Sequence, residues 1–502
     1  MGNKKLGILF LLGIFLAFFA GYYISIIIPT TPSASTNDVF DQLTTNFKNY
    51  YYYNIEDAEV EAAFIASMEG IIESYATMNN DPYTRLVANP LSVSPSGDEM
   101  FIGIGISFLM EDFNLRVSYV YAGGAADHFL YPNDLIIGIV DGSEIIYFDT
   151  LSSETEVLSY LAGSLDDVKT FIVLDPDNNE YQVQLTYIEI PTPTAYTLDL
   201  GEDDIEYIRI TRFSGYIKDV TPGTAKVFSD ILNALEASNL EIGSESKTLI
   251  IDLRDNPGGS LSALHNSENT AMIPGIAQQL LTHNVEAPLF QMIPKSGEIS
   301  NFYGNLTTPK TYDIVVLVNG HSASAAEVLA AALNTSGGYS LYGDLTYGKG
   351  VYQNTLNLYE ISNIRYSLVY TEGQWYYDQG KNVIEDPLDV NIIEQTGIKA
   401  LEMPVYGGEV GFNQVLNELG YYQAFLNYYY NLSGVNELRT DGYFDLATQN
   451  MFEDFQLEQS IDVSGKLDRQ TAIVIHQIYM QEIQDLTKDV QLSTLIDLIK
   501  TS

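Results

Sequence analysis

The chain has 502 residues, enough for about three domains, and carries a formal net charge of −43 at pH 7. It contains no cysteine, which excludes disulfides, zinc–thiolate sites and a thiol nucleophile. The negative charge is spread along the chain, so no basic surface is available for nucleic acid; we expect a strongly hydrated exterior and no nucleic-acid partner.

The first element is an uncharged apolar run, residues 6–28, which follows Lys4 and Lys5. A run of this length spans a bilayer of roughly 30 Å, and the two lysines keep the N-terminus on the cytoplasmic side. Because no convincing Ala-x-Ala cleavage site follows, residues 1–28 are predicted to be a single-pass signal anchor rather than a cleaved signal peptide. Either interpretation places the rest of the chain outside the cytoplasm.

Residues 29–90 are predicted to form a linker and a helical segment. The linker, residues 29–36, is rich in Pro, Ser and Thr. In residues 37–80 apolar side chains recur every three or four positions, which predicts helix. The helical pattern ends at the break Asp81–Val87.

Residues 91–190 change to short strand-like runs separated by Gly, Asp and Asn, with one helix at Glu154–Leu161. The segments FIGIGISF and AGGAADHFLYPNDLIIGIVDG, with this helix, resemble a PDZ domain. The resemblance implies that free backbone amides in the loop around Ile102, Gly103, Ile104, Gly105 and Ile106 hold a peptide carboxylate, and that the peptide adds as a strand. A β module without a ligand is the alternative.

This module departs from the PDZ pattern at Asn133. The family usually has glycine there, in a Pro-Gly-Asp turn. Because Asn tolerates the left-handed backbone conformation, we expect the turn to form here as well.

A tight turn follows a strand that is predicted to be buried. Thr248–Asp252 is the strand, and Asn256-Pro257-Gly258-Gly259 must turn sharply after it. Glycines let backbone amides approach a ligand with no side chain in the way. The turn by itself could simply connect a strand to a helix.

Ser324 lies in a small-residue turn before the apolar helix predicted at Glu327–Leu333. A helix N-terminus there supplies free amides and a dipole that stabilise an oxyanion. A serine nucleophile needs a base, usually histidine. The five histidines are scattered along the chain, without an obvious acidic companion: His128, His265, His283, His321 and His476.

Lys349, between two glycines, is the available base. To be neutral it must be buried, which has to lower its pKa from about 10.4 by roughly 3 units and costs on the order of 4 kcal/mol. Gln353, at i+4, falls on the same side and could hold the amine. Taken alone, Ser324 is better explained as a helix cap and Lys349 as a solvated turn lysine, and only the wider motif favours catalysis.

SASAAEVLAAAL followed by YGKGVYQ, with Lys349 placed 25 residues (349 − 324) after Ser324, resembles the carboxyl-terminal processing peptidases, PDZ-containing serine proteases of bacteria and plastids. The resemblance implies that Ser324 is the nucleophile, Lys349 the base and Gln353 the residue that orients the lysine. Oxyanion donors would be the backbone of Gly258 or Gly259 and of Ala325. It also implies an α/β spiral peptidase core within residues 191–400 and no metal or organic cofactor.

Three alternatives stay open around this motif. Ser322 is a rival nucleophile, although the family motif favours the second serine. His321 is close enough in sequence to Ser324 to invite a triad, although the motif is complete without it. The N-terminal helices pair subunits in some family members, so a homodimer and simple packing on the core are both compatible with this sequence.

Residues 411–480 contain a near-repeat, GYFDLAT and GKLDRQT, 23 residues apart (465 − 442). Each copy places an Asp as a predicted helix N-cap after a glycine turn. The unit resembles the small helical peptidoglycan-binding domain of secreted enzymes, which implies cell-wall peptidoglycan as a partner. A bundle whose groove no longer binds is the alternative, and residues 481–502 are predicted to be a helical tail.

The sequence thus predicts a multidomain α/β protein that is a membrane-anchored, extracytoplasmic serine endopeptidase acting on proteins with free C-termini. The alternatives are a catalytically silent, wall-bound PDZ scaffold and a hydrolase of esters or of the wall itself. The intact Ser324, Lys349 and Gln353 disfavour the scaffold, and the peptide-binding module disfavours the other hydrolase.

Overall fold

The structure is a computed structural model that describes residues 57–90, 100–151, 154–217, 221–238, 247–266, 273–361, 364–378 and 380–501. These residues belong to two compact units, one made of residues 57–90 and 355–370 and the other of the remainder. The predicted anchor, the linker and the helical residues before Asp57 lie outside the described residues. Within the described ranges, no helix is long and apolar enough to cross a membrane.

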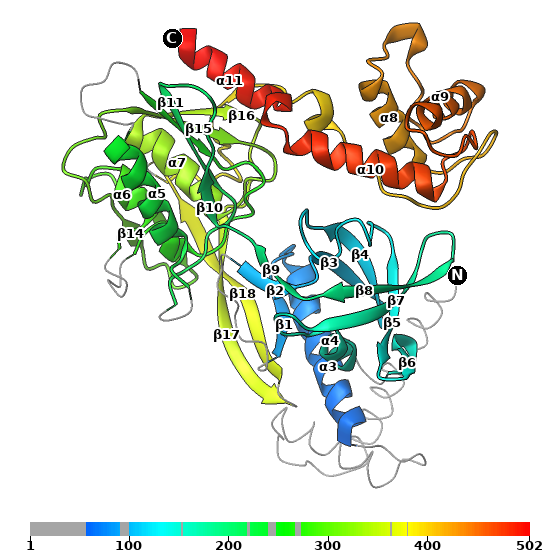
Figure 1. Cartoon of the computed structure of the whole chain (residues 1–502). Helices are drawn as coiled ribbons and strands as arrows, with labels where there is room; N and C mark the ends of the chain where they lie inside the picture. Colours follow the sequence, from blue (N-terminus) through cyan, green and yellow to red (C-terminus); the bar gives the residue numbers. More distant parts are fainter. Residues whose placement is uncertain are drawn as a thin grey trace, which may run out of the picture. The chain divides into compact units, whose positions relative to one another are not determined.

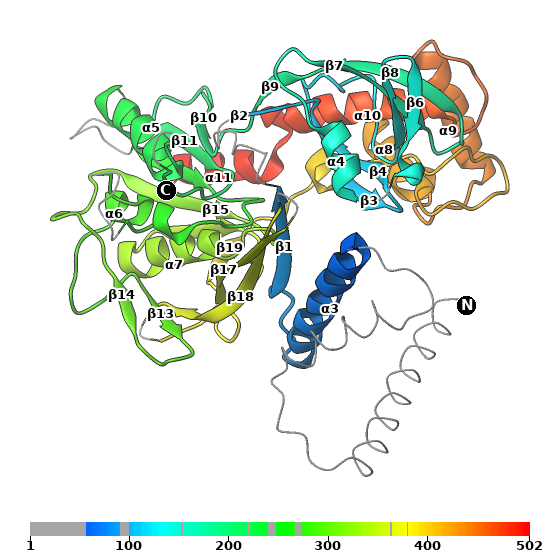
Figure 2. The ribbon, with the colours of Figure 1, turned by 90° about the horizontal axis from the view of Figure 1, so that it is seen from below.

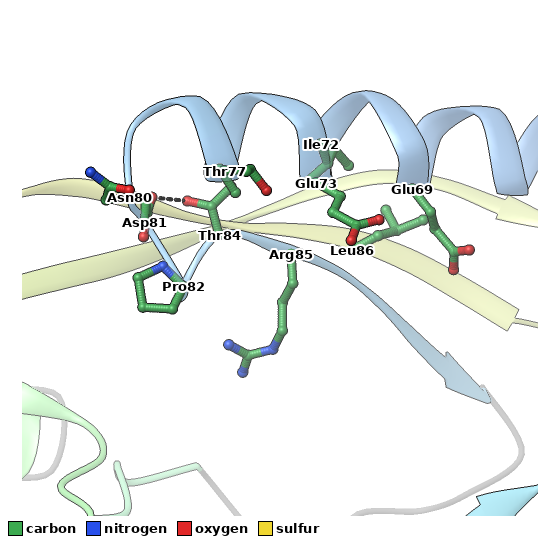
Figure 3. Close-up of a pocket in the computed structure, with 11 residues that line it drawn as sticks. Glu69, Ile72, Glu73, Thr77, Asn80, Asp81, Pro82, Thr84, Arg85 and Leu86 are labelled. Atoms are coloured by element: carbon green, nitrogen blue, oxygen red, sulfur yellow. Dashed lines mark hydrogen bonds between the residues drawn. The ribbon is translucent and has the colours of Figure 1, made fainter. Parts of the chain in front are cut away.

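The first unit contains helix α3 (Asp57–Met78) and strand β1 (Arg85–Pro90), which pairs antiparallel with residues 364–369. The predicted break after the helix is confirmed: Asp81 accepts hydrogen bonds from the Tyr83 amide (3.0 Å) and the Thr84 hydroxyl (2.6 Å). A cavity of about 730 Å³ lies between helix and strand, and Figure 3 shows Glu69, Glu73 and Arg85 around it. Neither Ser324 nor Lys349 lines this cavity.

The predicted strand-rich module forms a sheet in the order β3-β4-β5-β7-β8, with β6 beside β5 and a separate β2–β9 pair. The helix predicted at Glu154–Leu161 is α4, residue for residue, and it lies beside the sheet in Figure 2. Asn133 has φ 77°, so the expected left-handed turn is present. The strands are β2 (Met100–Gly103), β3 (Ile106–Glu111), β4 (Asn114–Val120), β5 (Leu135–Asp141), β6 (Glu144–Tyr147), β7 (Val168–Leu174), β8 (Glu180–Thr186) and β9 (Ile188–Pro191).

The central sheet has the order β10-β11-β12-β15-β16-β19, in which β10 is antiparallel to β11 and the other pairs are parallel. Apolar, buried runs such as Thr248–Asp252 are typical of parallel strands covered on both faces. The strands are β10 (Ala195–Thr197), β11 (Ile205–Ile210), β12 (Thr248–Asp252), β15 (Asp313–Val318), β16 (Ser340–Gly343) and β19 (Val390–Ile392).

Helices cover both faces of this sheet (Figure 1). One core cluster joins the sheet to α5 (Thr224–Ser238), α6 (Ile276–Leu280) and α7 (Ala325–Gly337). The opposite cluster joins it to α11 (Val490–Thr501) through Leu492 and Leu495. The last helix of the chain, predicted as a tail, therefore packs against the central sheet.

A second sheet contains β13 (Phe290–Pro294), β14 (Ser300–Phe302) and the long hairpin of β17 (Val351–Ile361) and β18 (Ile364–Tyr376). A short helical turn lies near His265, after strand β12. The structure has a short 3₁₀ helix at Leu261–Ala263 there, and α6 begins only at Ile276.

The C-terminal helical unit consists of α8 (Leu419–Tyr429), α9 (Leu446–Glu458) and α10 (Arg469–Gln484). Both predicted N-caps are confirmed, since Asp445 accepts from the Thr448 amide (2.8 Å) and Asp468 from the Thr471 amide (2.9 Å). Helix α10 continues past the boundary predicted at residue 480.

Candidate active site

Ser324 lies just beyond the carboxyl end of β15, as the N-cap of α7. Its φ of 55° and ψ of −116° are a strained conformation for a residue with a Cβ. The side chain is partly exposed, whereas the residues on both sides of it are buried. The turn therefore presents one hydroxyl at the end of the parallel sheet, where ligands bind in open α/β folds.

Ser322, the rival nucleophile, is fully buried. Its hydroxyl donates to the Leu253 carbonyl (2.8 Å) and accepts from the Asn319 amide (2.9 Å). These bonds connect the turn that contains Ser324, called the serine turn below, to the residue that follows β12. The turn Asn256–Gly259, called the glycine turn, comes directly after. The Ser322 hydroxyl therefore has a structural role. Ser324 is the serine that remains available to a substrate.

Glu327 connects the serine turn by hydrogen bonds to Gly348–Lys349, called the lysine turn below. Its carboxylate, on the first turn of α7, is fully buried. Oε2 accepts from the Ser324 amide (2.8 Å) and the Lys349 amide (2.9 Å), and Oε1 accepts from the Gly348 amide (2.7 Å). No role for Glu327 was predicted from the sequence. A signal was present, because an acidic residue three positions after an N-cap serine has capping-box spacing.

Lys349 is held by its backbone. Its carbonyl accepts from Trp375 Nε1 (2.8 Å) and its amide donates to Glu327 (2.9 Å). A Cβ on the next residue, Gly350, would lie 2.0 Å from Asn382 Oδ1, so glycine is required for this packing. The lysine side chain is half-buried. Gln353 follows on β17, where its Nε2 lies 3.4 Å from Thr371 Oγ1.

The glycine turn contacts the serine turn directly. Gly258 has φ 99°, and a Cβ there would lie 2.9 Å from both Ala325 N and Ser324 Cβ. The Gly258 amide already donates to Asn256 Oδ1 (2.8 Å). The Gly259 and Ala325 amides, by contrast, make no hydrogen bond within the described part of the chain.

Asn256 fixes this geometry and was also missed. Its Nδ2 donates to the Ile210 carbonyl (2.9 Å), and its own carbonyl accepts from the Ala323 amide (2.9 Å). The residue is fully buried. It therefore links β11, the glycine turn and the serine turn.

His321 is directed to a carboxylate. Its side chain is 81% exposed, and Nδ1 lies 3.2 Å from Asp255 Oδ1. Burial would raise the pKa of Asp255, but hydrogen bonds and charge from Asn319 and Arg209 outweigh burial and hold it below its usual range. No hydrogen bond joins His321 to Ser324 among the described residues.

A buried ion network lies behind the glycine turn. Arg254 pairs with Asp252 (2.7 Å) at the end of β12 and with Asp489 (2.8 Å) just before α11. Burial alone would raise the pKa of Asp489, but hydrogen bonding and charge from Arg254, with Lys399, lower it to about 2. The C-terminal segment thus supports the strand that carries the glycine turn.

Of the five predicted peptide-binding residues, Ile104 and Gly105 form the loop between β2 and β3, whereas Ile102 and Gly103 lie on β2 and Ile106 begins β3. Gly105 has φ 84°, and a Cβ there would lie 2.8 Å from Gly124 Cα. The Ile104 and Gly105 carbonyls accept from the Ala126 and Tyr121 amides, whereas the amides of Ile104 and Gly105 have no partner in the described ranges. Strand β3 pairs only with β4, so one edge of β3 is open within the described sheet.

Comparison with known proteins identifies two regions. Residues 204–393 match "Peptidase family S41", and residues 413–475 match "Putative peptidoglycan binding domain". The carboxy-terminal processing protease CtpB of Bacillus subtilis (strain 168) is 27% identical over 441 residues, 86% of this chain and 83% of that protein. The carboxy-terminal processing protease CtpA of the same organism is 22% identical over 484 residues, 93% of this chain and 92% of that protein.

Among solved structures, a photosystem II D1 C-terminal processing protease aligns over 70% of this chain and 86% of its own, with 21% identity and a TM-score of 0.38.

Proposed function

Because this chain carries a serine-type peptidase region of family S41 in residues 204–393, we propose that it is an extracytoplasmic endopeptidase that captures protein C-termini and cleaves with a Ser324–Lys349 dyad. The observation that carries the dyad is the shared carboxylate oxygen of Glu327, which binds the backbone of both residues at 2.8 and 2.9 Å. A buried carboxylate with three amide donors is a stiff connection, so the serine and lysine turns move as one body.

The chemistry follows from this arrangement. The neutral Lys349 amine takes the proton of the Ser324 hydroxyl as Oγ attacks the substrate carbonyl. The Gly259 and Ala325 amides stabilise the resulting oxyanion. The lysine ammonium then protonates the departing amine. Water then attacks the acyl-enzyme and gives a proton to the Lys349 amine, the bond between the acyl carbon and Ser324 Oγ breaks, and the ammonium returns the proton to Oγ as the second product leaves. Gln353 orients the lysine.

Substrate capture is assigned to the PDZ-like module. Free amides at Ile104 and Gly105 suit a carboxylate, and the open edge of β3 suits an added strand. The free amides favour a free protein C-terminus over an internal segment, because only a C-terminus carries a main-chain carboxylate.

Two segments would determine where in the cell the protein is located. Residues 6–28 would anchor the protein in the cell membrane, with the peptidase outside. The C-terminal helical unit, which matches a peptidoglycan-binding domain, would hold the protein near the cell wall. Digestion of intact cells with an added protease would show exposure, and retention on purified wall would show wall binding.

The deciding experiment uses protein that lacks residues 1–28 and an unfolded test protein with an apolar C-terminus. Wild type should cleave it, and Ser324→Ala and Lys349→Ala should not. Amidation of the substrate C-terminus should weaken binding, because it removes the charge that the loop amides hold. Equal binding of free and amidated forms would refute carboxylate capture. An inactive wild type that still binds peptide and wall would instead indicate a scaffold.

A further inference from the structure

A cavity of about 280 Å³ opens where the glycine turn ends. Its walls come from three segments of the peptidase core: Ser214–Tyr216, Leu261–Asn266 and the start of α5. Phe302 of β14 also lines it. None of the residues that the proposed chemistry uses lies in its wall.

The cavity is close to the reacting atoms because of backbone pairing. The Phe213 amide donates to the Gly258 carbonyl (2.8 Å), and the Ser260 amide donates to the Phe213 carbonyl (2.7 Å). Ser214 and Leu261, the next residues on the two paired segments, already line the cavity. Since consecutive Cα atoms are about 3.8 Å apart, Leu261 Cα lies within about 8 Å of Gly259 Cα.

Among the described residues of the lining, the one permanent charge is that of a lysine. No carboxylate is among the described residues that form the wall, although the chain as a whole has a net charge of −43. The lysine, Lys226, is paired with Asp230. Burial lowers the pKa of His265, so its ring is neutral at neutral pH.

The shape of the wall is fixed by packing. His265 lies 3.2 Å from Gln278, whose Oε1 accepts from the Asn266 amide (2.9 Å) and the Gly275 amide (2.8 Å). The His265 ring also packs edge-on against Phe302, with ring centroids 5.1 Å apart. The cavity is therefore a preformed recess whose wall combines apolar and aromatic side chains with uncharged polar ones such as Ser262 and Asn266.

We propose that this cavity receives the side chain of the substrate residue whose carbonyl Ser324 attacks, and that it selects large uncharged side chains. The inference rests on the proposed function. A carbonyl held at Gly259 and Ala325 is bonded to the Cα of its own residue, so that residue's side chain must lie beside the glycine turn. The volume equals that of about nine liquid waters at ~30 Å³ each, which is room for Leu, Met or Phe.

Selectivity follows from the wall chemistry. An apolar side chain that fills the recess gains burial, and each missing methylene costs about 10–200-fold in kcat/KM in a well-fitted pocket. A basic side chain would find no carboxylate to pair with among the described residues of the wall. An acidic one would lose much of its hydration, and the one cation in the described wall, Lys226, is already paired with Asp230.

The experiment maps the bonds that the protein cleaves in an unfolded protein by mass spectrometry, and then measures kcat/KM on peptides that differ only at the residue before the cleaved bond. Wild type should prefer Leu, Met and Phe. Ala225→Phe, at the start of α5, fills the recess and should shift the preference to Ala and Gly by at least about tenfold. Ala234→Phe, an exposed position on the same helix, should leave the preference unchanged.

A second variant tests the pocket assignment if Ala225→Phe does not fold. Ser262 is an exposed residue of the wall, so Ser262→Asp should fold and should raise cleavage after Lys and Arg by about tenfold, whereas Ser262→Asn should not. Active variants whose preference matches wild type would overturn the pocket assignment and leave the peptidase intact. A wild type that cleaves nothing would instead overturn the proposed function, and the pocket assignment with it.

Discussion

The backbone amides of Ser324 and Lys349, 25 residues apart in the sequence (349 − 324), donate to the same oxygen, Oε2 of Glu327, at 2.8 and 2.9 Å. A third amide, that of Gly348, donates to Oε1 of this buried side chain at 2.7 Å. Positions of the two candidate catalytic residues are therefore coupled through one carboxylate. Small displacements matter here, since a shift of about 1 Å at a catalytic group can cost on the order of 10²-fold in rate.

Glu327→Gln should lower both activity and stability. The amide keeps one acceptor oxygen but turns an N–H₂ group toward backbone donors, so at least one buried amide loses its partner. We expect a loss of about 2–4 kcal/mol in the free energy of unfolding and about 10²-fold in kcat. Urea unfolding and steady-state cleavage measure the two effects. Glu236→Gln is the control, because Glu236 accepts from Lys310 and Tyr312 (2.6 Å each) and lines no part of the site.

Ser324→Ala and Lys349→Ala should each lower kcat by on the order of 10⁴-fold or more, because nucleophile and base act as a unit. Ser322→Ala should stay within about tenfold of wild type, since it loses only structural hydrogen bonds of roughly 1 kcal/mol each. Cleavage of an unfolded protein measures all three. If Ser322→Ala were inactive and Ser324→Ala active, Ser322 would be the nucleophile.

His321→Ala should retain activity and the wild-type pH profile. Its ring is exposed and paired with Asp255, and the proposed chemistry takes its base from Lys349. An activity–pH profile of the variant is the measurement. Loss comparable to that of Lys349→Ala would assign the base to the histidine.

Leu495→Ala should destabilise the peptidase core by about 2–5 kcal/mol, because it leaves a cavity between α11 and the central sheet. Leu498→Ala, on the same helix but 45% exposed, should change stability by only about 0.5 kcal/mol. Urea unfolding of both variants is the comparison. Equal, small effects would mean that the last helix is the free tail predicted from the sequence.

Acid should destabilise the protein through His476 on α10. Burial lowers its pKa to about 4, and nearby groups such as the Asp127 carboxylate only partly oppose this. The unfolded state, with a pKa near 6.5, binds the proton first as pH falls, so stability is lost below about pH 6.5, by about 2 kcal/mol at pH 5. His476→Phe should remove this loss, measured as unfolding free energy at pH 7.5 and 5. His128→Phe, at an exposed ring, should behave as wild type.

Gly105→Ala should weaken binding of a free C-terminal peptide by at least about tenfold. The new methyl group would meet Gly124 and the residue would keep an unfavourable positive φ, at a cost of about 1–3 kcal/mol, so the loop would shift. Gly142→Ala has a similar positive φ with open space around it, which isolates the backbone strain from the loop. Calorimetric titration measures the peptide affinity of both variants. If the two variants bind the peptide equally well, the loop at Gly105 does not take part in peptide binding.

Local signals in the sequence were enough for much of the fold. The buried run Thr248–Asp252 is strand β12, and Glu154–Leu161 is helix α4, each residue for residue. The Asp445 and Asp468 caps were predicted from the glycine turn before each residue and the helical run after it. These features depend on side-chain periodicity and on hydrogen bonds within one turn, which neighbouring residues dictate.

The sequence by itself therefore determined the elements, the serine–lysine motif and the glycines that the turns require. Three features were decided only by the tertiary structure. Glu327 accepts hydrogen bonds from both the serine and the lysine turn. Asn256 accepts from the Gly258 amide and not from the Gly259 amide, and the last helix packs on one face of the central sheet. These are contacts between segments far apart in the chain. No local period or cap encodes them, because they form only when packing brings the segments together.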